Sequence, residues 1–224
     1  MIEAKDVTLI YADGTIALNN VELQVRPGEL VYIVGRSGSG KTSLLRLFMG
    51  AEYPTKGTLK VLGQPIIKEE AANIRRLRMK IGPVFQEFRL IKGRTAIENI
   101  SLGMRFLDIS SKQLKENAYD ALAKVGLKHK AFSPIENLSW GERQRIAIAR
   151  AVARKPLLIL ADEPTGNLDK DNALNILELL TSFQSERTTI IITTHATHLV
   201  DYSKADKLIE VEEGKIYCKK LGSV

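Results

Sequence analysis

The stretch GRSGSGKT at residues 35–42 constrains the fold of this chain more than any other feature. It fits the pattern G-x-x-x-x-G-K-[ST], and it lies between the short apolar run ELVYIV and the helical run KTSLLRLFMG. Glycines in such a loop let backbone N–H groups turn inward to form an anion-binding nest, and the helix N-terminus adds its dipole. The pattern therefore predicts a strand–loop–helix unit that holds nucleotide phosphates. A Rossmann dinucleotide site is not predicted, because no G-x-G-x-x-G follows the strand.

The candidate nucleotide-binding residues of this loop are consecutive: Gly35, Arg36, Ser37, Gly38, Ser39, Gly40, Lys41, Thr42 and Ser43. Lys41 is expected to neutralise the β- and γ-phosphates, and Thr42 to offer its hydroxyl to Mg²⁺. The alternative is an idle glycine turn. The flanking strand and helix, both in the required order, make that alternative the weaker one.

The remaining pattern predicts an α/β protein. Apolar and polar residues alternate on both sides of Asp13 and Gly14, which indicates an antiparallel hairpin over residues 2–25. Further extended segments are expected at 29–34, 57–63 and 81–85, with a helix at 74–80 between the last two. After residue 156 we expect strands at 157–162, 188–194, 206–211 and 215–220, and a helix near 170–185.

Residues from about 87 to 156 have a different character. The segment 111–126, SKQLKENAYDALAKVG, has helical spacing, and one of its faces carries five apolar residues: Leu114, Ala118, Ala121, Leu122 and Val125. No strand is predicted in this region. We therefore expect a P-loop core of mainly parallel sheet (1–86 and 157–224) with an N-terminal antiparallel β subdomain and an inserted helical subdomain at about 87–156.

Four predicted strands are followed directly by residues that are able to bind a ligand or take part in catalysis. They end at the Gly35 loop, at Gln86, at Asp162 with Glu163, and at His195. In open α/β sheets, ligands bind outside the carboxyl ends of the strands. These four ends are therefore expected to contribute to one composite site.

Each of the candidates at this site also has an ordinary structural explanation. Asp162 suits Mg²⁺ coordination and Glu163 suits polarisation of an attacking water, but adjacent acids also form solvated turns or helix caps. His195 is either a structural histidine or a sensor of the γ-phosphate that orients Glu163. Gln86 is either a surface amide or a metal ligand that reports nucleotide state to the helical region. Tyr11 is either a core residue of the hairpin or a platform on which adenine stacks.

Composition narrows the classes of protein to consider. Lys and Arg number 33 against 26 Asp and Glu, a net charge of +7 that favours anionic partners such as nucleotides, nucleic acid or an acidic membrane surface. The single cysteine, Cys218, excludes an internal disulfide framework. The longest apolar run, LLILA, is far shorter than the ~20 residues that cross a bilayer, and the N-terminus lacks a signal-peptide pattern. We expect a soluble cytosolic protein.

Together these elements closely resemble the ATP-binding subunits of ABC transporters over nearly the whole chain. Seven motifs carry the resemblance: Tyr11 (A-loop), GRSGSGKT (Walker A), Gln86 (Q-loop), LSWGE at 138–142 (signature), LLILADEP at 157–164 (Walker B), NLD at 167–169 (D-loop) and His195 (switch histidine). The resemblance implies an ATPase with Mg²⁺ as cofactor and the ABC ATPase fold. It also implies that two copies pair head to tail on ATP, with Ser139, Gly141 and Glu142 acting in trans and Asp169 coupling the two sites.

Two segments narrow the resemblance to one branch of the family. ADEPTGNLD at 161–169 is similar to the FtsE cell-division ATPases and to the lipoprotein-release and macrolide-exporter ATPases, and residues 84–100 most resemble FtsE. The FtsE resemblance implies a polytopic FtsX-like membrane partner that docks on about 87–105, a role in cell division and cell-wall remodelling, and a peripheral position on the inner face of the membrane. A lipoprotein-release or macrolide-type exporter is the alternative. No nucleic-acid partner is expected, because the chain lacks the long coiled-coil inserts and tandem nucleotide domains of soluble ABC proteins that act on DNA or ribosomes.

The signature segment departs from the family pattern at one residue. SWGE predicts a capping box between Ser139 and Glu142, followed by a helix to about Arg154. On that helix Ile146, Ala149 and Ala153 are expected toward the core, and Arg143, Arg150 and Arg154 on another face. The signature is most often LSGGQ or LSGGE, so Trp140 replaces its first glycine. We expect an ATPase that is slow or dependent on its partner, or else an ATP-gated scaffold with little turnover, because glycine permits backbone conformations that an indole does not.

Overall fold

The computed structural model describes residues 1–166 and 168–221, which divide into two units. The first comprises Met1–Arg78 together with the chain from Gln184 onward, and the second comprises Met79–Phe183. Asn167, the first residue of the NLD match, and residues 222–224 lie outside the described residues.

The N-terminal part of the first unit is an antiparallel sheet with strand order β2-β1-β4-β5. Its strands are β1 (Ile2–Ile10), β2 (Ile16–Val25), β4 (Lys56–Val61) and β5 (Gln64–Pro65). The predicted hairpin is confirmed, since β1 pairs with β2 from Ile2 opposite Val25 to Ile10 opposite Ile16. Its turn closes where the Gly14 N–H donates to the Tyr11 carbonyl, and Gly14 takes the positive φ of 85° that glycine permits.

The first unit also contains β3 (Leu30–Val34), β8 (Thr189–Thr194), β9 (Lys207–Glu212) and β10 (Lys215–Lys220), in the order β10-β9-β3-β8. β3 runs parallel to both β8 and β9, whereas β9 and β10 form an antiparallel hairpin. Every residue of β3 and β8 is buried, as expected of parallel strands covered on both faces.

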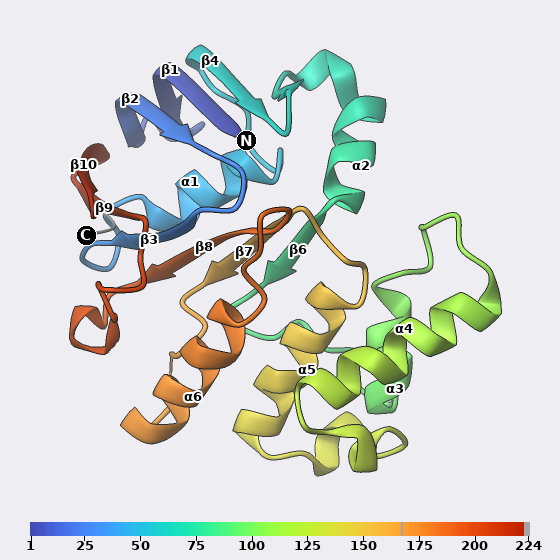
Figure 1. Cartoon of the computed structure of the whole chain (residues 1–224). Helices are drawn as coiled ribbons and strands as arrows, with labels where there is room; N and C mark the ends of the chain where they lie inside the picture. The colour runs from blue at the N-terminus through green and yellow to red at the C-terminus, as the bar shows by residue number, and fades with distance from the viewer. Residues whose placement is uncertain (167, 222–224) are drawn as a thin grey trace. The chain divides into compact units, whose positions relative to one another are not determined.

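Short helices complete the first unit. Figure 1 shows α1 (Lys41–Phe48) between the antiparallel sheet and β3. Leu44, Leu45, Leu47 and Phe48 of α1 are at most 1% exposed, so this helix fills the core of the unit. The others are η1 (Lys68–Glu70), α2 (Ala71–Met79) and η4 (Thr197–Leu199).

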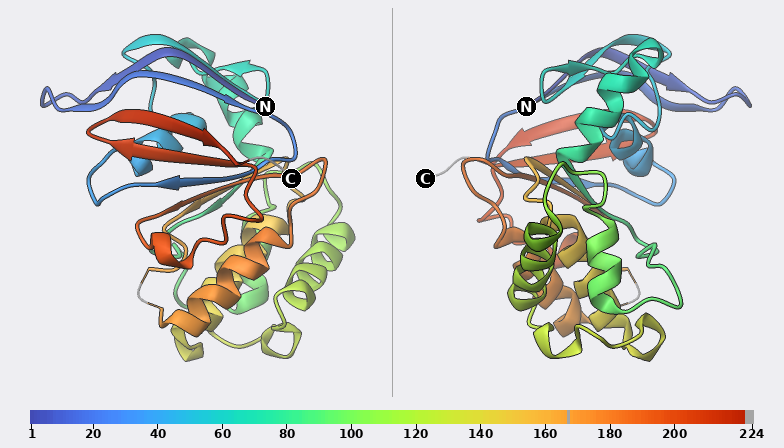
Figure 2. Two further views of the ribbon diagram at one scale, coloured as in Figure 1. Left: turned by 60° about the vertical axis from the view of Figure 1, so that its left-hand side comes forward. Right: turned by 90° about the vertical axis from the view of Figure 1, so that its right-hand side faces the viewer.

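In its described residues (79–166 and 168–183), the second unit combines two parallel strands with four α-helices. The strands are β6 (Ile81–Val84) and β7 (Leu158–Asp162), and the helices are α3 (Ala96–Leu102), α4 (Ser111–Lys124), α5 (Trp140–Val152) and α6 (Lys170–Thr181), with 3₁₀ turns η2 (Lys128–Lys130) and η3 (Ile135–Asn137). α3, α4 and α5 pack against one another, and α5 also contacts β6 and α6 (Figure 2). Each of these four helices begins with a side chain that accepts a backbone N–H: Thr95, Ser110, Ser139 and Asp169.

The predicted mixture of antiparallel and parallel sheets with interspersed helices is confirmed. Residues 87–156, all of them described, contain helices and no strand beyond the isolated bridge between Thr95 and Pro134. On α4, Ala118, Ala121 and Leu122 are buried and Leu114 is half-buried, and Val125, the residue that caps its C-terminus, is also buried. The limits of a helical subdomain at about 87–156 stay a prediction, because the second unit also contains β6, β7 and α6. Among the described residues, no helix has both the length and the apolar character needed to cross a membrane.

Candidate functional site

The phosphate loop connects β3 to α1, and two of its glycines are required by close packing. A Cβ at Gly35 would lie 2.3 Å from the Val211 carbonyl oxygen, and one at Gly40 would lie 2.6 Å from the Ala17 carbonyl oxygen. Gly38 differs, since it has φ 76° and a Cβ there would meet nothing within 4 Å. The sequence thus folds into a loop that is fixed at both ends and open in the middle.

Two polar side chains of the loop point to an anionic ligand. Lys41 is only 5% exposed, and its Nζ donates to the carbonyls of Gly35 (2.8 Å) and Arg36 (2.9 Å), so its ammonium group lies within the curve of the loop. The buried Ser39 Oγ has no hydrogen-bond partner among the described residues. A buried hydroxyl without a partner calls for an explanation, and a bound phosphate oxygen supplies one. Arg36, Ser37 and Thr42 are exposed around it.

Tyr11 lies at the end of β1, and its hydroxyl shares a 2.9 Å hydrogen bond with the Ser43 hydroxyl on α1. Its ring is half-buried. This bond ties the predicted adenine platform to the helix that follows the phosphate loop. Stacking of adenine on the ring stays a prediction.

His195 comes directly after β8, and Val34 of β3 is paired with Thr194 of β8. The residues that follow these two strands, Gly35 and His195, therefore emerge from the same end of neighbouring parallel strands. His195 is exposed. Within the first unit, the structure thus brings the switch candidate next to the start of the phosphate loop, as the strand ends predicted.

The second unit brings its own two strand ends together. Val84 of β6 is paired with Ala161 of β7, so Gln86 and Glu163 each follow by two residues. A Cβ on Gly166 would lie 3.5 Å from Gln86 Nε2, which places this amide beside the 163–166 turn. The Gly166 N–H closes that turn on the Glu163 carbonyl at 3.1 Å.

Glu163 is 8% exposed and has φ 45°, a left-handed conformation that non-glycine residues rarely adopt. Asp162, directly before it, is half-buried. Strained backbone of this kind persists where the surroundings impose it, and it is frequent at functional sites. The turn after β7 is therefore held in an unusual shape, and its shape positions the Glu163 carboxylate.

Gln144 helps to impose that shape, and the sequence reasoning missed it. This α5 residue is 1% exposed, its Nε2 donates to the Pro164 carbonyl at 2.6 Å, and its Oε1 is buried without a partner. A signal was available, since Gln144 falls on the same helical face as the buried Ala147, Ile148 and Ala151. A polar residue on a buried face marks a specific hydrogen bond.

The signature segment forms the predicted capping box. Ser139 Oγ accepts the Glu142 N–H (3.3 Å), and the Glu142 carboxylate accepts the Ser139 N–H (2.8 Å). The Ser139 N–H, with help from the nearby Lys130, lowers the pKa of the Glu142 carboxyl. Gly141 lies in the first turn of α5, and a Cβ there would meet nothing within 4 Å.

Trp140 is the first residue of α5 and has no left-handed conformation, so an indole at this position causes no backbone strain. Its ring packs on Phe88 with a centroid distance of 4.4 Å and an interplanar angle of 60°, and 39% of the residue stays exposed. Phe88 belongs to the segment that follows Gln86. The signature tryptophan is therefore in contact with the predicted Q-loop of the same unit.

Arg143 and Arg150 of α5 and Arg154, just beyond its end, bind backbone carbonyls. Arg143 donates to the Ile135 and Glu136 carbonyls, and Arg154 donates to those of Ile81 and Gly103. Burial lowers the pKa of Arg154, and burial together with the charge of Arg154 lowers the pKa of Arg150 to about 10. These guanidinium groups organise loops of the second unit.

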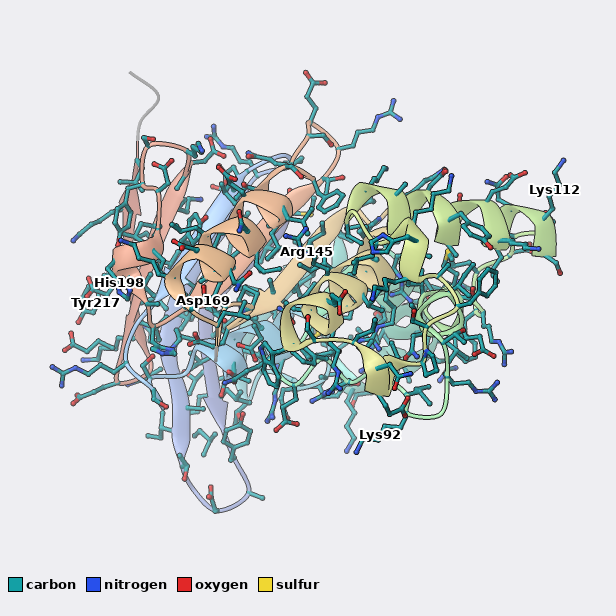
Figure 3. All side chains as sticks on the ribbon, turned by 90° about the horizontal axis from the view of Figure 1, so that it is seen from below. Lys92, Lys112, Arg145, Asp169, His198 and Tyr217 are labelled. Atoms are coloured by element: carbon teal, nitrogen blue, oxygen red, sulfur yellow. The ribbon has the colours of Figure 1, made fainter. Side chains whose placement is uncertain are left out.

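Asp169, labelled in Figure 3, caps α6, since its carboxylate accepts the Asn172 N–H at 3.0 Å. This hydrogen bond is the main cause that lowers the pKa of Asp169. The carboxylate is exposed and therefore open to a second molecule.

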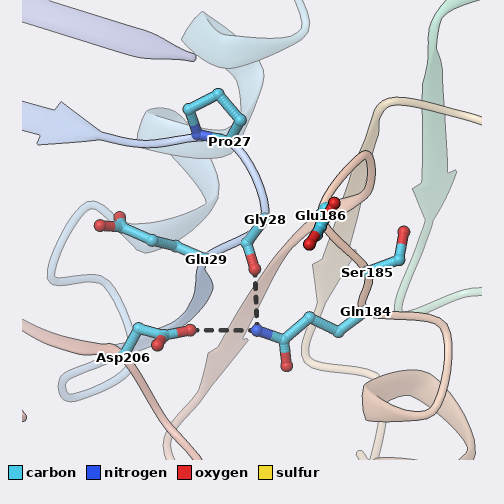
Figure 4. Close-up of a pocket in the computed structure, with 7 residues that line it drawn as sticks. All are labelled: Pro27, Gly28, Glu29, Gln184, Ser185, Glu186 and Asp206. Atoms are coloured by element: carbon cyan, nitrogen blue, oxygen red, sulfur yellow. Dashed lines mark hydrogen bonds between the residues drawn. The ribbon is translucent and has the colours of Figure 1, made fainter. Parts of the chain in front are cut away.

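A separate pocket of about 430 Å³ in the first unit contains none of the motif residues (Figure 4). Its lining residues are Pro27, Gly28, Glu29, Gln184, Ser185, Glu186 and Asp206. The Gln184 amide donates to the Gly28 carbonyl and to Asp206, which also accepts the Leu30 N–H. These bonds join loops of the unit, so the pocket has a structural explanation.

A parallel strand that leads through a glycine loop to a helix, with a lysine inside the loop, defines the class of P-loop nucleotide-binding proteins. The family model for ABC transporters matches residues 18–166. The chain belongs to the ABC transporter family, and it is an ATP-binding cassette with ATPase activity.

Similar proteins agree with this assignment. The cell division ATP-binding protein FtsE of Streptococcus pneumoniae is 40% identical, over 96% of this chain and 94% of its own. The lipoprotein-releasing system ATP-binding protein LolD of Pseudoalteromonas translucida is 37% identical, over 98% and 96%. Among solved structures, a dimeric post-hydrolysis state of the ATP-binding cassette MJ0796 with ADP and Pi has a TM-score of 0.88 at 32% identity and full coverage of both chains. The predicted ABC ATPase fold and the similarity to FtsE are confirmed.

Proposed function

We propose that this chain is the ATP-hydrolysing subunit of a membrane complex that acts in bacterial cell division, with an FtsX-like protein as its membrane partner. The observation that carries the proposal is the near end-to-end similarity to FtsE proteins. Two features of the structure support it: the phosphate loop, in which Lys41 donates to the Gly35 carbonyl, and the turn after Glu163, in which Gln144 donates to the Pro164 carbonyl. The similarity to LolD supports a second candidate, the ATPase of a lipoprotein-release exporter.

The phosphate loop binds the nucleotide. The N–H groups around Gly38 and the N-terminal end of α1 face the phosphates, and Ser39 Oγ donates to a phosphate oxygen. Lys41 exchanges the carbonyls of Gly35 and Arg36 for the β- and γ-phosphate oxygens, at little desolvation cost because its ammonium group is already buried. Tyr11 contacts the adenine, and its bond to Ser43 keeps the ring in place.

The metal ligands are Thr42, Gln86 and Asp162. These hydroxyl, amide and carboxylate oxygens are hard ligands of the kind that suit Mg²⁺. When bound, Mg²⁺ neutralises the charge of the β- and γ-phosphate oxygens. Gln86 lies beside the 163–166 turn, so its position depends on the conformation of that turn.

Glu163 is the general base that polarises the attacking water, and His195 orients Glu163 and senses the γ-phosphate. The burial of Glu163 and its left-handed backbone restrict the carboxylate to few directions. Gln144 maintains this restriction through the carbonyl of Pro164.

A second copy of the chain closes the site in trans through Ser139, Gly141 and Glu142, with Asp169 coupling the two sites. Ser139 Oγ accepts a hydrogen bond in the capping box and retains its own hydrogen for a γ-phosphate oxygen. The open Gly141 leaves room for the phosphate at the N-terminus of α5. The dimeric arrangement of the similar MJ0796 cassette supports this step.

The segment 87–105 receives the membrane partner, which places the chain on the inner face of the membrane. Asn99, 1% exposed, keeps this segment in shape: its Oδ1 accepts the Ile91 N–H, and its Nδ2 donates to the carbonyls of Ile91 and Thr95. A docking surface formed by this segment is therefore preorganised.

The decisive variant is Glu163→Gln. It should bind ATP, lose hydrolysis and accumulate as dimers, because the amide cannot accept a proton from water. Glu186→Gln, which alters an exposed acid of the first unit, is the matched control and should hydrolyse ATP normally. Hydrolysis at the unchanged rate in Glu163→Gln would exclude this residue as the base.

The membrane role is tested by pull-down from detergent-solubilised membranes. A polytopic protein that co-purifies with the chain identifies the partner and separates the cell-division role from lipoprotein release. Recovery of ribosomes or DNA alone would refute the membrane assignment. Turnover measured with the recovered partner distinguishes an enzyme, which the partner accelerates, from an ATP-gated scaffold.

A further inference from the structure

The segment that follows Gln86 has an unusual backbone. Phe88 and Arg89 have φ values of 43° and 48°, both in the left-handed region, although neither is glycine. Phe88 is nevertheless only 8% exposed, which is uncommon for a loop residue. Contacts from elsewhere in the second unit must therefore maintain this conformation.

Two of those contacts come from α5. Arg150, near the end of the helix, donates to the carbonyls of Phe88 and Arg89 at 2.5 Å each. Trp140, the first residue of the helix, packs its indole on the Phe88 ring at 4.4 Å. Trp140 and Arg150 are ten residues apart, or about 15 Å along the helix axis, and both side chains reach Phe88, the indole at its ring and the guanidinium at its carbonyl.

The position of Trp140 gives this contact a mechanical consequence. Its neighbour Ser139 caps the helix through the reciprocal bonds with Glu142, so the backbone of Trp140 lies between the cap and the rest of a fixed first turn of α5. The segment 85–89 is joined to that turn by an aromatic contact and to the other end of the helix by Arg150. A displacement of the Gln86 segment therefore has to carry the signature turn with it.

We propose that Trp140 is a positioning residue that couples the Gln86 segment to the signature turn through its contact with Phe88. The proposal rests on the function proposed above and assigns a purpose to the one signature position at which this chain departs from the usual glycine. The coupling has two consequences. Nucleotide contact at Gln86, or partner contact at the segment that begins with residue 87, changes the position of Ser139. The indole packs on Phe88 of its own chain and favours ATP turnover. The sequence alone had suggested the opposite, namely that a tryptophan in place of glycine slows the ATPase.

The test is a double-mutant cycle on the full-length protein with Trp140→Ala, Phe88→Ala and the double variant. Each single variant should lower kcat for ATP hydrolysis about 3- to 10-fold, which is the rate change that corresponds to the interaction energy of one aromatic pair. The KM for ATP should stay within about twofold, because the phosphate loop is intact. The double variant should be no slower than either single one, because both remove the same contact. Trp140→Phe keeps an aromatic ring at the position and should recover most of the activity.

A matched control removes an aromatic pair of the same unit that the proposal does not use. Phe132→Ala breaks the edge contact between Phe132 and Tyr119, whose centroids are 6.5 Å apart, and kcat should stay at the wild-type value. Trp140 is the only tryptophan of the chain, so its emission reports the contact independently of activity. Phe88→Ala should shift the emission to longer wavelength as the indole gains water, and addition of ATP should change the emission of the wild type more than that of Phe88→Ala.

Three outcomes would overturn the coupling. The first is a double variant whose fold-loss in kcat is the product of the two single losses, and the second is a Trp140→Phe protein as slow as Trp140→Ala. The third is a tryptophan emission that is the same in Phe88→Ala as in the wild type. A rise of kcat in Trp140→Ala would show that the indole obstructs closure, which also refutes the proposal. Failure of the proposed function has a different signature, namely a pull-down that recovers no polytopic membrane protein, and in that case kcat and the emission of Phe88→Ala still test the contact.

Discussion

Replacement of Gln144 by leucine should separate catalysis from stability in the second unit. The wild-type amide makes one buried hydrogen bond, from Nε2 to the Pro164 carbonyl, and leaves its Oε1 buried without a partner. Leucine removes the bond and leaves the Pro164 carbonyl buried without a partner, at a cost of about 1–3 kcal/mol. It also removes the unpartnered Oε1, which relieves a penalty of about 1–3 kcal/mol. Because these terms largely cancel, the free energy of unfolding should change by about 1 kcal/mol or less.

The effect on hydrolysis should be much larger. Pro164 follows Glu163, and without the Gln144 amide nothing from α5 restrains its carbonyl. Since a displacement of about 1 Å at a catalytic group can cost up to about 100-fold in rate, kcat should fall about 10-fold or more, and the KM for ATP should stay within about twofold.

Urea denaturation and steady-state ATP hydrolysis measure the two quantities on the same preparation. Gln113→Leu is the control, since Gln113 is an exposed amide on α4 that donates to Asn117 and touches no candidate site residue. A folded Gln144→Leu protein with wild-type kcat would refute the reasoning. So would a loss of about 3 kcal/mol or more in stability, because it would mean that the penalties do not cancel.

Two further predictions concern Asn99 and Glu142. Asn99→Ala orphans the Ile91 N–H and carbonyl, so urea denaturation should show a loss of about 2–4 kcal/mol; a loss below about 1 kcal/mol would contradict the role given to this side chain. The pKa of Glu142 is lowered from 4.5, chiefly by the Ser139 N–H, so its carboxylate stabilises the folded state above about pH 4.5 and this contribution is lost as the pH falls through the lowered pKa. Thermal melts of wild type and Glu142→Gln should therefore differ above that pH and converge below it; a difference that is constant with pH would refute the assignment.

Local patterns in the sequence were sufficient to predict the secondary-structure elements and the phosphate loop. The hairpin over residues 2–25 follows from period-two alternation and a turn glycine, and the cap of α5 follows from a serine and a glutamate three residues apart. Gly35 and Gly40 lie in a spacing that already predicted the loop. Each of these predictions rests on a local sequence pattern, so it needs no knowledge of tertiary contacts.

The contacts that shape the candidate site had no local signal of the same kind. Trp140 meets Phe88, and Gln144 meets the Pro164 carbonyl, across 52 and 20 residues respectively. The left-handed backbone of Glu163 is equally invisible in the sequence, because the residue type disfavours it. These arrangements exist only once α5 has packed against its neighbours in the second unit.

The sequence by itself determined that this chain is an ATP-binding cassette, because the residues that contact phosphate, water and metal have to occur at set spacings along strand ends and helix starts. The tertiary structure decided what the unusual tryptophan contacts. Side chains distant in the chain find their partners only through packing, and packing placed the indole on the segment that follows Gln86.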